Sequence, residues 1–202
     1  MAIVNPVKIG NMALSHVGVS STIESLTENS VEAAQISLWY DFSREQALEM
    51  LDWNFARKRQ TLASHADDPA DDGVWAFRYQ YPADALMART LVNPAGPDAD
   101  AIPFEVENSE DGSDKSILTD LDEAVLVYTF NLQDTGLFSP MFIEALSYLM
   151  AHHIAFALTG DRALKGEMLQ TYIALLRVAQ TYNANEGQAA PPRDAESIRA
   201  RD

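Results

Sequence analysis

Hydrophobic positions repeat with a helical period at the N-terminal end of the chain. Asn5-Pro6 has the form of a helix cap followed by proline at the first helical position. A second helix is expected from Asn29-x-x-Glu32, which resembles a capping box. The apolar residues that fit one face of these two helices are Ile9, Met12, Ala13 and Val17, and then Val31, Ala34, Leu38, Phe42 and Leu48.

The C-terminal end shows the same period. Ser139-Pro140 predicts the start of a third helix that ends near Thr159-Gly160, and Asp161 is the expected cap of a fourth helix. Their apolar stripes contain Phe142, Leu146, Leu149, His153 and Ala157, and then Leu164, Met168, Tyr172, Leu175, Ala179 and Tyr182. Each of these helices should therefore bury one stripe.

Between the two helical ends the pattern changes to a period of two. Trp75, Phe77, Tyr79 and Tyr81 alternate with less apolar residues, which indicates a half-buried strand that Pro82 ends or places at a sheet edge. The run at 124–130 is apolar on both faces and should be central in its sheet. Further strands are expected at 86–92, 104–106 and 117–119.

The order of helices, strands and helices predicts an α+β fold that is mainly α. We expect an antiparallel four-helix bundle with an inserted small antiparallel β domain and an extended C-terminal tail. The tail is expected because Ala190-Pro191-Pro192 cannot continue a helix. The expected domains are 1–54 (bundle helices 1 and 2), 55–137 (inserted β domain), 138–184 (bundle helices 3 and 4) and 185–202 (tail).

The net charge of −16 is concentrated in the middle of the chain. Residues 61–138 contain three Lys/Arg and sixteen Asp/Glu, a net charge of −13, which argues against a surface that grips DNA phosphates. A solvated, solubility-promoting surface is the simplest interpretation. The chain has no cysteine, which removes disulfides and zinc–cysteine sites. No apolar run approaches the roughly 18–20 residues of a membrane helix, so we expect a soluble protein made in a cytoplasm.

Catalytic and metal-binding motifs are not found in the sequence. His152-His153 are adjacent and point about 100° apart on a helix, so they cannot share a metal as i,i+4 ligands do. The Asp67-Asp68 and Asp71-Asp72 pairs lie in an expected loop, where nothing forces their oxygens to converge on a cation. We therefore expect no enzyme activity, no cofactor and no metal.

One basic cluster, Arg57-Lys58-Arg59, interrupts this acidic chain. It is either a solvated strand or turn, or a contact with an acidic partner, with DNA backbone or with a neighbouring copy's acidic middle segment. The tail supplies the other candidate partner contacts, which are Pro191, Pro192, Arg193, Arg199 and Arg201.

Several short fragments occur in an order that resembles one protein family. Trp53-x-Phe55-Ala56-x-x-Arg59 follows Tyr40-Asp41 and Arg44, and Tyr81-Pro82 and Asp84 come later. The other fragments are Asn11-Met12-Ala13-Leu14, Val17-Gly18, Ile23, Asn29-Ser30, Ala33-Ala34, Leu62, Trp75, Tyr79, Ile117-Leu118-Thr119-Asp120, Tyr128, Phe142-x-x-Ala145-Leu146 and Ala151. Over roughly residues 5–182 the chain resembles the tail tubular protein A family of short-tailed bacteriophages, the head-to-tail adaptor or gatekeeper protein.

This resemblance implies a structural, non-enzymatic function. Family members form a dodecameric ring below the portal protein, continue the DNA channel and dock the tail. The implied partners are other copies of the chain, the portal above, a tail nozzle, tail tube or terminator protein below, and double-stranded DNA that passes through without specific binding; no membrane is implied. The implied location is the head-to-tail interface of a virion assembled in the host cytoplasm.

Two alternatives to the adaptor remain open at this point: a small soluble enzyme, or an acidic protein-binding module, with a pocket between bundle and sheet. In an adaptor, part of the acidic middle segment would face the DNA channel or a basic partner. Only acidic residues close to the DNA could act on it, because more distant charges are screened at physiological salt. The candidates for this role are Asp67, Asp68, Asp71, Asp72, Glu110, Asp111 and Asp114.

Overall fold

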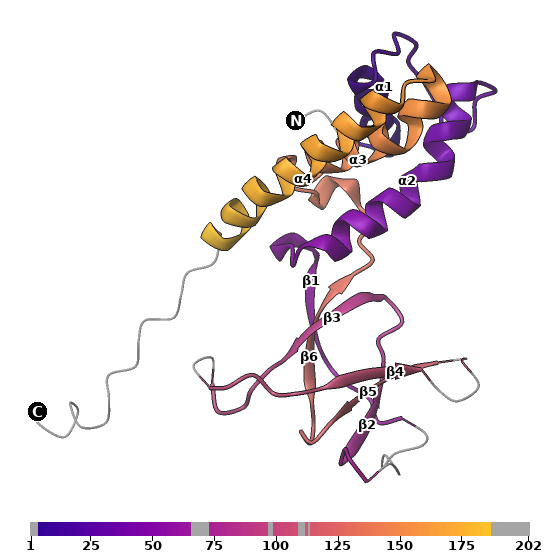
Figure 1. Cartoon of the computed structure of the whole chain (residues 1–202). Coiled ribbons are helices and arrows are strands. Elements are labelled where there is room, and N and C mark those ends of the chain that lie inside the picture. Colours follow the sequence, from indigo (N-terminus) through magenta and orange to yellow (C-terminus); the bar gives the residue numbers. More distant parts are fainter. Residues whose placement is uncertain (1–3, 66–72, 97–98, 109–111, 113, 187–202) are drawn as a thin grey trace, which may run out of the picture.

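Helices and strands occupy separate ends of the molecule (Figure 1). The computed structural model describes residues 4–65, 73–96, 99–108, 112 and 114–186. The described helices are α1 (Pro6–His16), α2 (Val31–Met50), α3 (Pro140–Thr159) and α4 (Arg162–Asn185), with short 3-10 turns at Asn54–Ala56 and Thr135–Leu137. The segregation of helices from strands agrees with the expected α+β class. Most of the expected tail, 187–202, lies outside the described residues.

Side-chain caps fix where the helices begin. Oδ1 of Asn5 accepts a hydrogen bond from the backbone N–H of Lys8 at 2.8 Å, and Ser139 and Asp161 cap α3 and α4 in the same way. The cap of α2 is Ser30, one residue later than expected, and its hydroxyl donates to Glu28 while accepting from Ala33. Such caps satisfy N–H groups that have no partner inside the helix.

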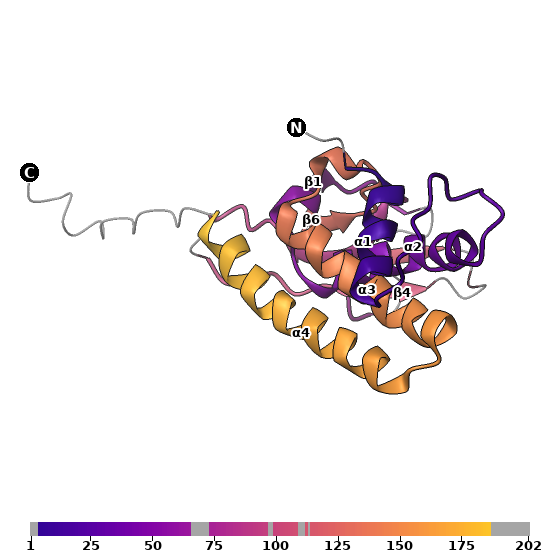
Figure 2. The ribbon, with the colours of Figure 1, turned by 90° about the horizontal axis from the view of Figure 1, so that it is seen from above.

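The four helices are not arranged as an antiparallel four-helix bundle, so this part of the predicted fold is wrong. α1, α2 and α4 each pack on α3, and α2 and α4 lie on different sides of it (Figures 1 and 2). α3 buries residues around most of its circumference, including Phe142, Leu146 and Ile154. A helix that is apolar on most faces occupies the centre of a helical cluster. Periodicity predicted one buried stripe for each helix, but in α2 the predicted residues Val31, Leu38 and Phe42 are exposed, while Ile36 and Tyr40 on the opposite face are buried. Periodicity also did not predict which helix each stripe would contact.

α3 also differs from the expectation about apolar runs. It is long and apolar enough to span a membrane by length and composition, and half of its most apolar window is buried inside the protein. Its central position accounts for this composition, because α1, α2 and α4 cover it.

The strands form two three-stranded antiparallel sheets. Their orders are β1-β6-β3 and β2-β5-β4, so β6 is central as its apolar sequence predicted. Residues from both sheets, including Tyr79, Ile117, Leu126 and Tyr128, share a core that is separate from the main helical core. The strands are β1 (Arg57–Thr61), β2 (Phe77–Gln80), β3 (Ala85–Leu91), β4 (Glu105–Asn108), β5 (Lys115–Thr119) and β6 (Val125–Phe130).

Candidate functional site

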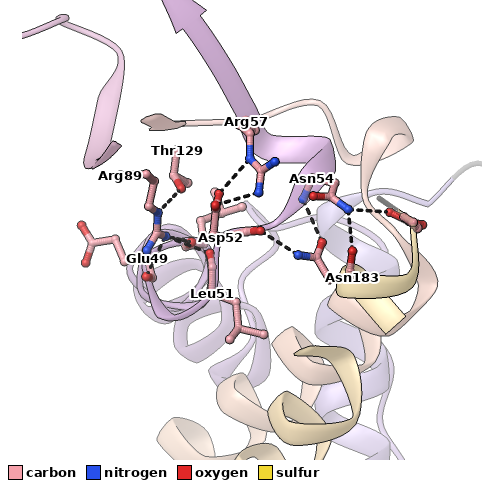
Figure 3. Close-up of polar contacts among 10 residues, drawn as sticks. Glu49, Leu51, Asp52, Asn54, Arg57, Arg89, Thr129 and Asn183 are labelled. Atoms are coloured by element: carbon pink, nitrogen blue, oxygen red, sulfur yellow. Dashed lines mark hydrogen bonds and ion pairs between the residues drawn. The ribbon is translucent and has the colours of Figure 1, made fainter. Parts of the chain in front are cut away.

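The most developed polar site lies where the helices meet the strands, and we call it the junction (Figure 3). At its centre Arg89 of β3 reaches the C-terminal end of α2. Nη2 of Arg89 donates to the carbonyl oxygens of Leu51 at 2.8 Å, Glu49 at 2.9 Å and Leu48 at 3.3 Å, while Nε donates to Oγ1 of Thr129 at 2.8 Å. The last carbonyls of a helix lack partners and carry partial negative charge. Arg89 therefore caps α2 from the β sheet.

Arg44 makes a second connection, from the middle of α2 to the segment after β6. Its side chain is 2% exposed and donates to Oδ1 of Asn131 and, at 3.0 Å, to the carbonyl of Leu132. It also pairs with Glu45 at 3.2 Å and Asp41 at 3.5 Å. A buried guanidinium needs this many acceptors to offset the loss of water. The helix and the strand exit are thus held together by a buried charge.

Two asparagines connect the far end of α4 to the same region. The backbone N–H of Asn54 donates to Oδ1 of Asn183 at 2.9 Å, and the side-chain amide of Asn54 donates to the carbonyl of Asn183 at 2.7 Å. The amide of Asn183 in turn donates to the carbonyl of Asp52 at 2.7 Å. The last turn of α4 is therefore fixed to the link between α2 and β1.

The predicted basic cluster forms β1, an edge strand with all five residues exposed. Arg57 makes a two-point ion pair with Asp52 at 2.7 and 3.1 Å. Lys58 pairs with Asp84 at 2.6 Å and lies over the ring of Phe130. In the described part of the chain, Arg59 is the member of the cluster without an ion pair. The structure thus pairs Arg57 and Lys58 with carboxylates of the same chain, while the side chain of Arg59 is exposed.

Of the other predicted partner and channel residues, the structure places only Asp114, which is exposed immediately before β5. The predicted acidic residues 67–72 precede β2 in the sequence, and the acidic residues 110–111 follow β4. The adjoining ends of β2 and β4 pair with opposite ends of β5, because Phe77 pairs with Thr119 and Asn108 pairs with Lys115. The predicted residues outside the described ones are Asp67, Asp68, Asp71, Asp72, Glu110, Asp111, Pro191, Pro192, Arg193, Arg199 and Arg201.

The adjacent histidines pack rather than converge. His153 stacks on Trp39, and burial, with the nearby His152 and Lys165, lowers the pKa of His153 to about 4. Nδ1 of His152 lies 2.9 Å from the carbonyl oxygen of Lys165. Among the described residues there is no group of three or more His, Asp or Glu placed to hold a metal.

An open hollow of about 460 Å³ lies between the start of α1 and the middle of α2. Its charged groups are Asp41, Arg44 and Glu45, and both carboxylates pair with the guanidinium of Arg44. The single cation of the hollow is therefore already occupied by two carboxylates of the same helix.

Sequence reasoning missed most of the junction. Arg44 entered only through the family resemblance, Arg89 was only one of the three Lys/Arg in residues 61–138, and Asn183 lay only within the range of the expected fourth helix. A detectable signal exists for Arg89, which is a single cation within the apolar run 85–92 and therefore needs an acceptor. Asn54 and Asn183 carry no such signal, because their contact joins positions 129 residues apart.

Neither protein-family models nor curated proteins give a match to this sequence.

Proposed function

We propose that this chain is a structural head-to-tail adaptor of a phage or phage-like particle. In this proposal copies of the chain form a ring below the portal, continue the DNA channel and dock the tail. The chain performs no chemistry; its task is to hold two different partners at a fixed distance and angle. The order of the fragments that resemble the tail tubular protein A family, from Tyr40-Asp41 to Phe142, is the starting point.

The junction is the single structural observation that carries the proposal. The helical part and the β part have separate cores, so each offers its own surface to a partner. Arg89, Arg44 and the Asn54–Asn183 pair join these parts through backbone carbonyls and buried charge. Packed and hydrogen-bonded elements resist deformation, so force on one part is transmitted to the other. An adaptor between head and tail needs this property.

The charge distribution supports the same proposal. DNA binds proteins by releasing counterions when Lys and Arg neutralise phosphates. The middle segment 61–138, with its net charge of −13, offers DNA little opportunity for this. A channel lined by such residues lets DNA pass without being held.

Electron microscopy of the purified protein, alone and with the portal protein of the same particle, tests the proposal. Rings that bind the portal are the expected result. The variant Arg89→Met should still meet the portal but give rings with a variable angle between the two parts. A protein that stays monomeric with the portal and does not bind it would overturn the proposal. A monomer that binds a metabolite would favour the enzyme alternative.

A further inference from the structure

Two exposed apolar strips lie on different helices of the same part of the molecule. The first, the α2 strip, consists of Val31, Leu38 and Phe42, of which Leu38 is 64% and Phe42 55% exposed. At about 100° per residue these three positions share one helix face, opposite the buried Ile36 and Tyr40. Exposed apolar residues that share one face, rather than being scattered singly, mark a contact surface.

The second strip, the α4 strip, consists of Ala174, Val178 and Tyr182. They follow one another at four-residue spacing, and Val178 is 46% and Tyr182 62% exposed. The surrounding sequence is unusual for this chain, because residues 168–185 contain no acid and only one charged residue, Arg177. A face with one cation and no acid is suited to contact an acidic surface, and other copies of this chain supply such surfaces because each contains thirty Asp and Glu residues.

The charges beside the two strips are opposite. Asp41 and Glu49 flank the α2 strip and are exposed, while the only cation of α2, Arg44, is buried. Arg177 lies beside the α4 strip and is exposed. α2 and α4 lie on different sides of α3, so one copy cannot join its own two strips (Figure 2).

We infer that the α2 strip of one copy binds the α4 strip of the next copy. The occupant of each strip is therefore a second copy of this chain. A contact between two different surfaces of identical copies is heterologous: it repeats head to tail and gives a ring when the rotation closes. This inference rests on the ring assembly proposed above and names the surfaces that build it.

Cross-linking through introduced cysteines tests the contact, since the natural chain contains none. One variant carries Leu38→Cys, a second carries Val178→Cys and a third carries both. With a flexible bismaleimide at high protein concentration, the double variant should give a ladder of covalent oligomers. Each single variant alone should give no covalent oligomers, and a mixture of the two should give covalent dimers and nothing larger. The matched control pairs Leu38→Cys with Val106→Cys on the exposed strand β4.

A charge reversal and a deletion complete the test. Arg177→Glu in the double variant should slow ladder formation at least about tenfold, because like charges then oppose each other. Deletion of residues 187–202 should leave the ladder unchanged. The inference is overturned if a single variant forms covalent dimers as rapidly as the mixture does, or if the control pair gives as many covalent oligomers as the test pair. It is also overturned if deletion of the tail abolishes the ladder, because the α2 strip would then bind the tail.

The outcomes separate this inference from the proposed function. A strip-dependent ladder without portal binding would overturn the adaptor and leave the contact standing. Rings on the portal whose cross-links ignore both strips would overturn the contact and leave the adaptor standing.

Discussion

The imidazole of His153 lies flat against the indole of Trp39. The ring centres are 4.4 Å apart and the planes differ by 6°, and the edge of Phe42 closes the arrangement from another side. His153 thus joins α3 to α2 through an aromatic stack. Among the described residues its buried Nε2 has no hydrogen-bond partner, so a proton added there would gain a charge without an acceptor.

This stack predicts acid sensitivity. The pKa of His153 is lowered to about 4 in the folded protein, against about 6.5 in an unfolded chain. Between these values the unfolded chain binds the proton more readily, so the free energy of unfolding should fall as the pH drops below about 6.5 and stop falling from this cause below about 4. His153→Phe keeps an aromatic ring on Trp39 and should lose less stability over this range.

Urea unfolding of both proteins at pH values from 7.5 to 4, followed by tryptophan fluorescence, measures the difference. The carboxylates and His16 titrate in both proteins, so their effects cancel in the comparison. Parallel curves for the two proteins would show that His153 does not carry the acid sensitivity.

Loss of Arg89 should weaken the junction. Arg89→Met removes bonds to the carbonyls of α2 and to Thr129, and hydrogen bonds from charged groups contribute about 1.5–3 kcal/mol. We expect unfolding to cost about 2–3 kcal/mol less, measured by chemical denaturation. Arg89→Lys should restore only part of this, since an ammonium lacks the planar fork of a guanidinium.

The matched control for Arg89 is Arg59→Met on the exposed strand β1, which should change stability by about 0.5 kcal/mol or less. Equal losses in both variants would show that the α2 cap is not a special stabilising contact.

Asn183→Ala should release the end of α4. The substitution removes the side-chain bonds to Asn54 and Asp52, and we expect a loss of about 1–2 kcal/mol. Hydrogen exchange at the backbone N–H of Asn54 should become faster. Gln180→Ala, an exposed position on the same helix, is the control and should leave this exchange unchanged. Unchanged exchange in Asn183→Ala would contradict the assignment.

The C-terminal residues should serve attachment and not folding. The core residues of α4 end at Ala179 and its last fixed turn is held by Asn183, so deletion of residues 187–202 should leave the melting temperature nearly unchanged. The deletion should reduce the yield of complete particles, counted by electron microscopy. An unchanged yield would remove Pro191, Pro192, Arg193, Arg199 and Arg201 from the predicted contacts.

Exchange of Asp67, Asp68, Asp71 and Asp72 for Lys should create DNA affinity. The affinity should fall steeply with salt, because each neutralised phosphate adds about 0.9 to the slope of log affinity against log salt. Ring formation should persist, since charges in a solvated loop, where the sequence predicts these residues, contribute little to folding. Exchange of the same residues for Asn removes charge without adding cations and should create no affinity. Lysine variants that also bind no DNA would return this segment to a role in solubility.

Local chemistry made several elements predictable. Asn5, Ser139 and Asp161 cap helices where the sequence predicts, and β6 is central because both of its faces are apolar. The arrangement of the helices was not predictable in the same way. A stripe of apolar residues predicts a contact surface, but the partner depends on contacts far apart in sequence. In α2 the predicted residues Leu38 and Phe42 are exposed, and α3 occupies the centre of the helices.

The exposed strand β1 and the junction show a second limit of prediction from local sequence. All five residues of β1 are exposed, so its sequence has no alternation for a pattern to detect. Its position comes from pairing with β6, from Arg57 opposite Thr129 to Thr61 opposite Val125. The Asn54–Asn183 contact likewise forms only after the chain has folded. Local sequence therefore predicted the elements and left the residues that join them unassigned.

The Arg89 cap makes the chain tolerant of one kind of mutation and intolerant of another. Arg89 contacts carbonyl oxygens, which every amino acid supplies, so an exposed position such as Glu49 is free to change its side chain without loss of the cap. Length is different. One residue inserted before Leu48 would turn the helix end by about 100° and carry the carbonyls away from Arg89. Divergent relatives should therefore vary in composition at the end of α2 while keeping the residue count between Arg44 and Trp53.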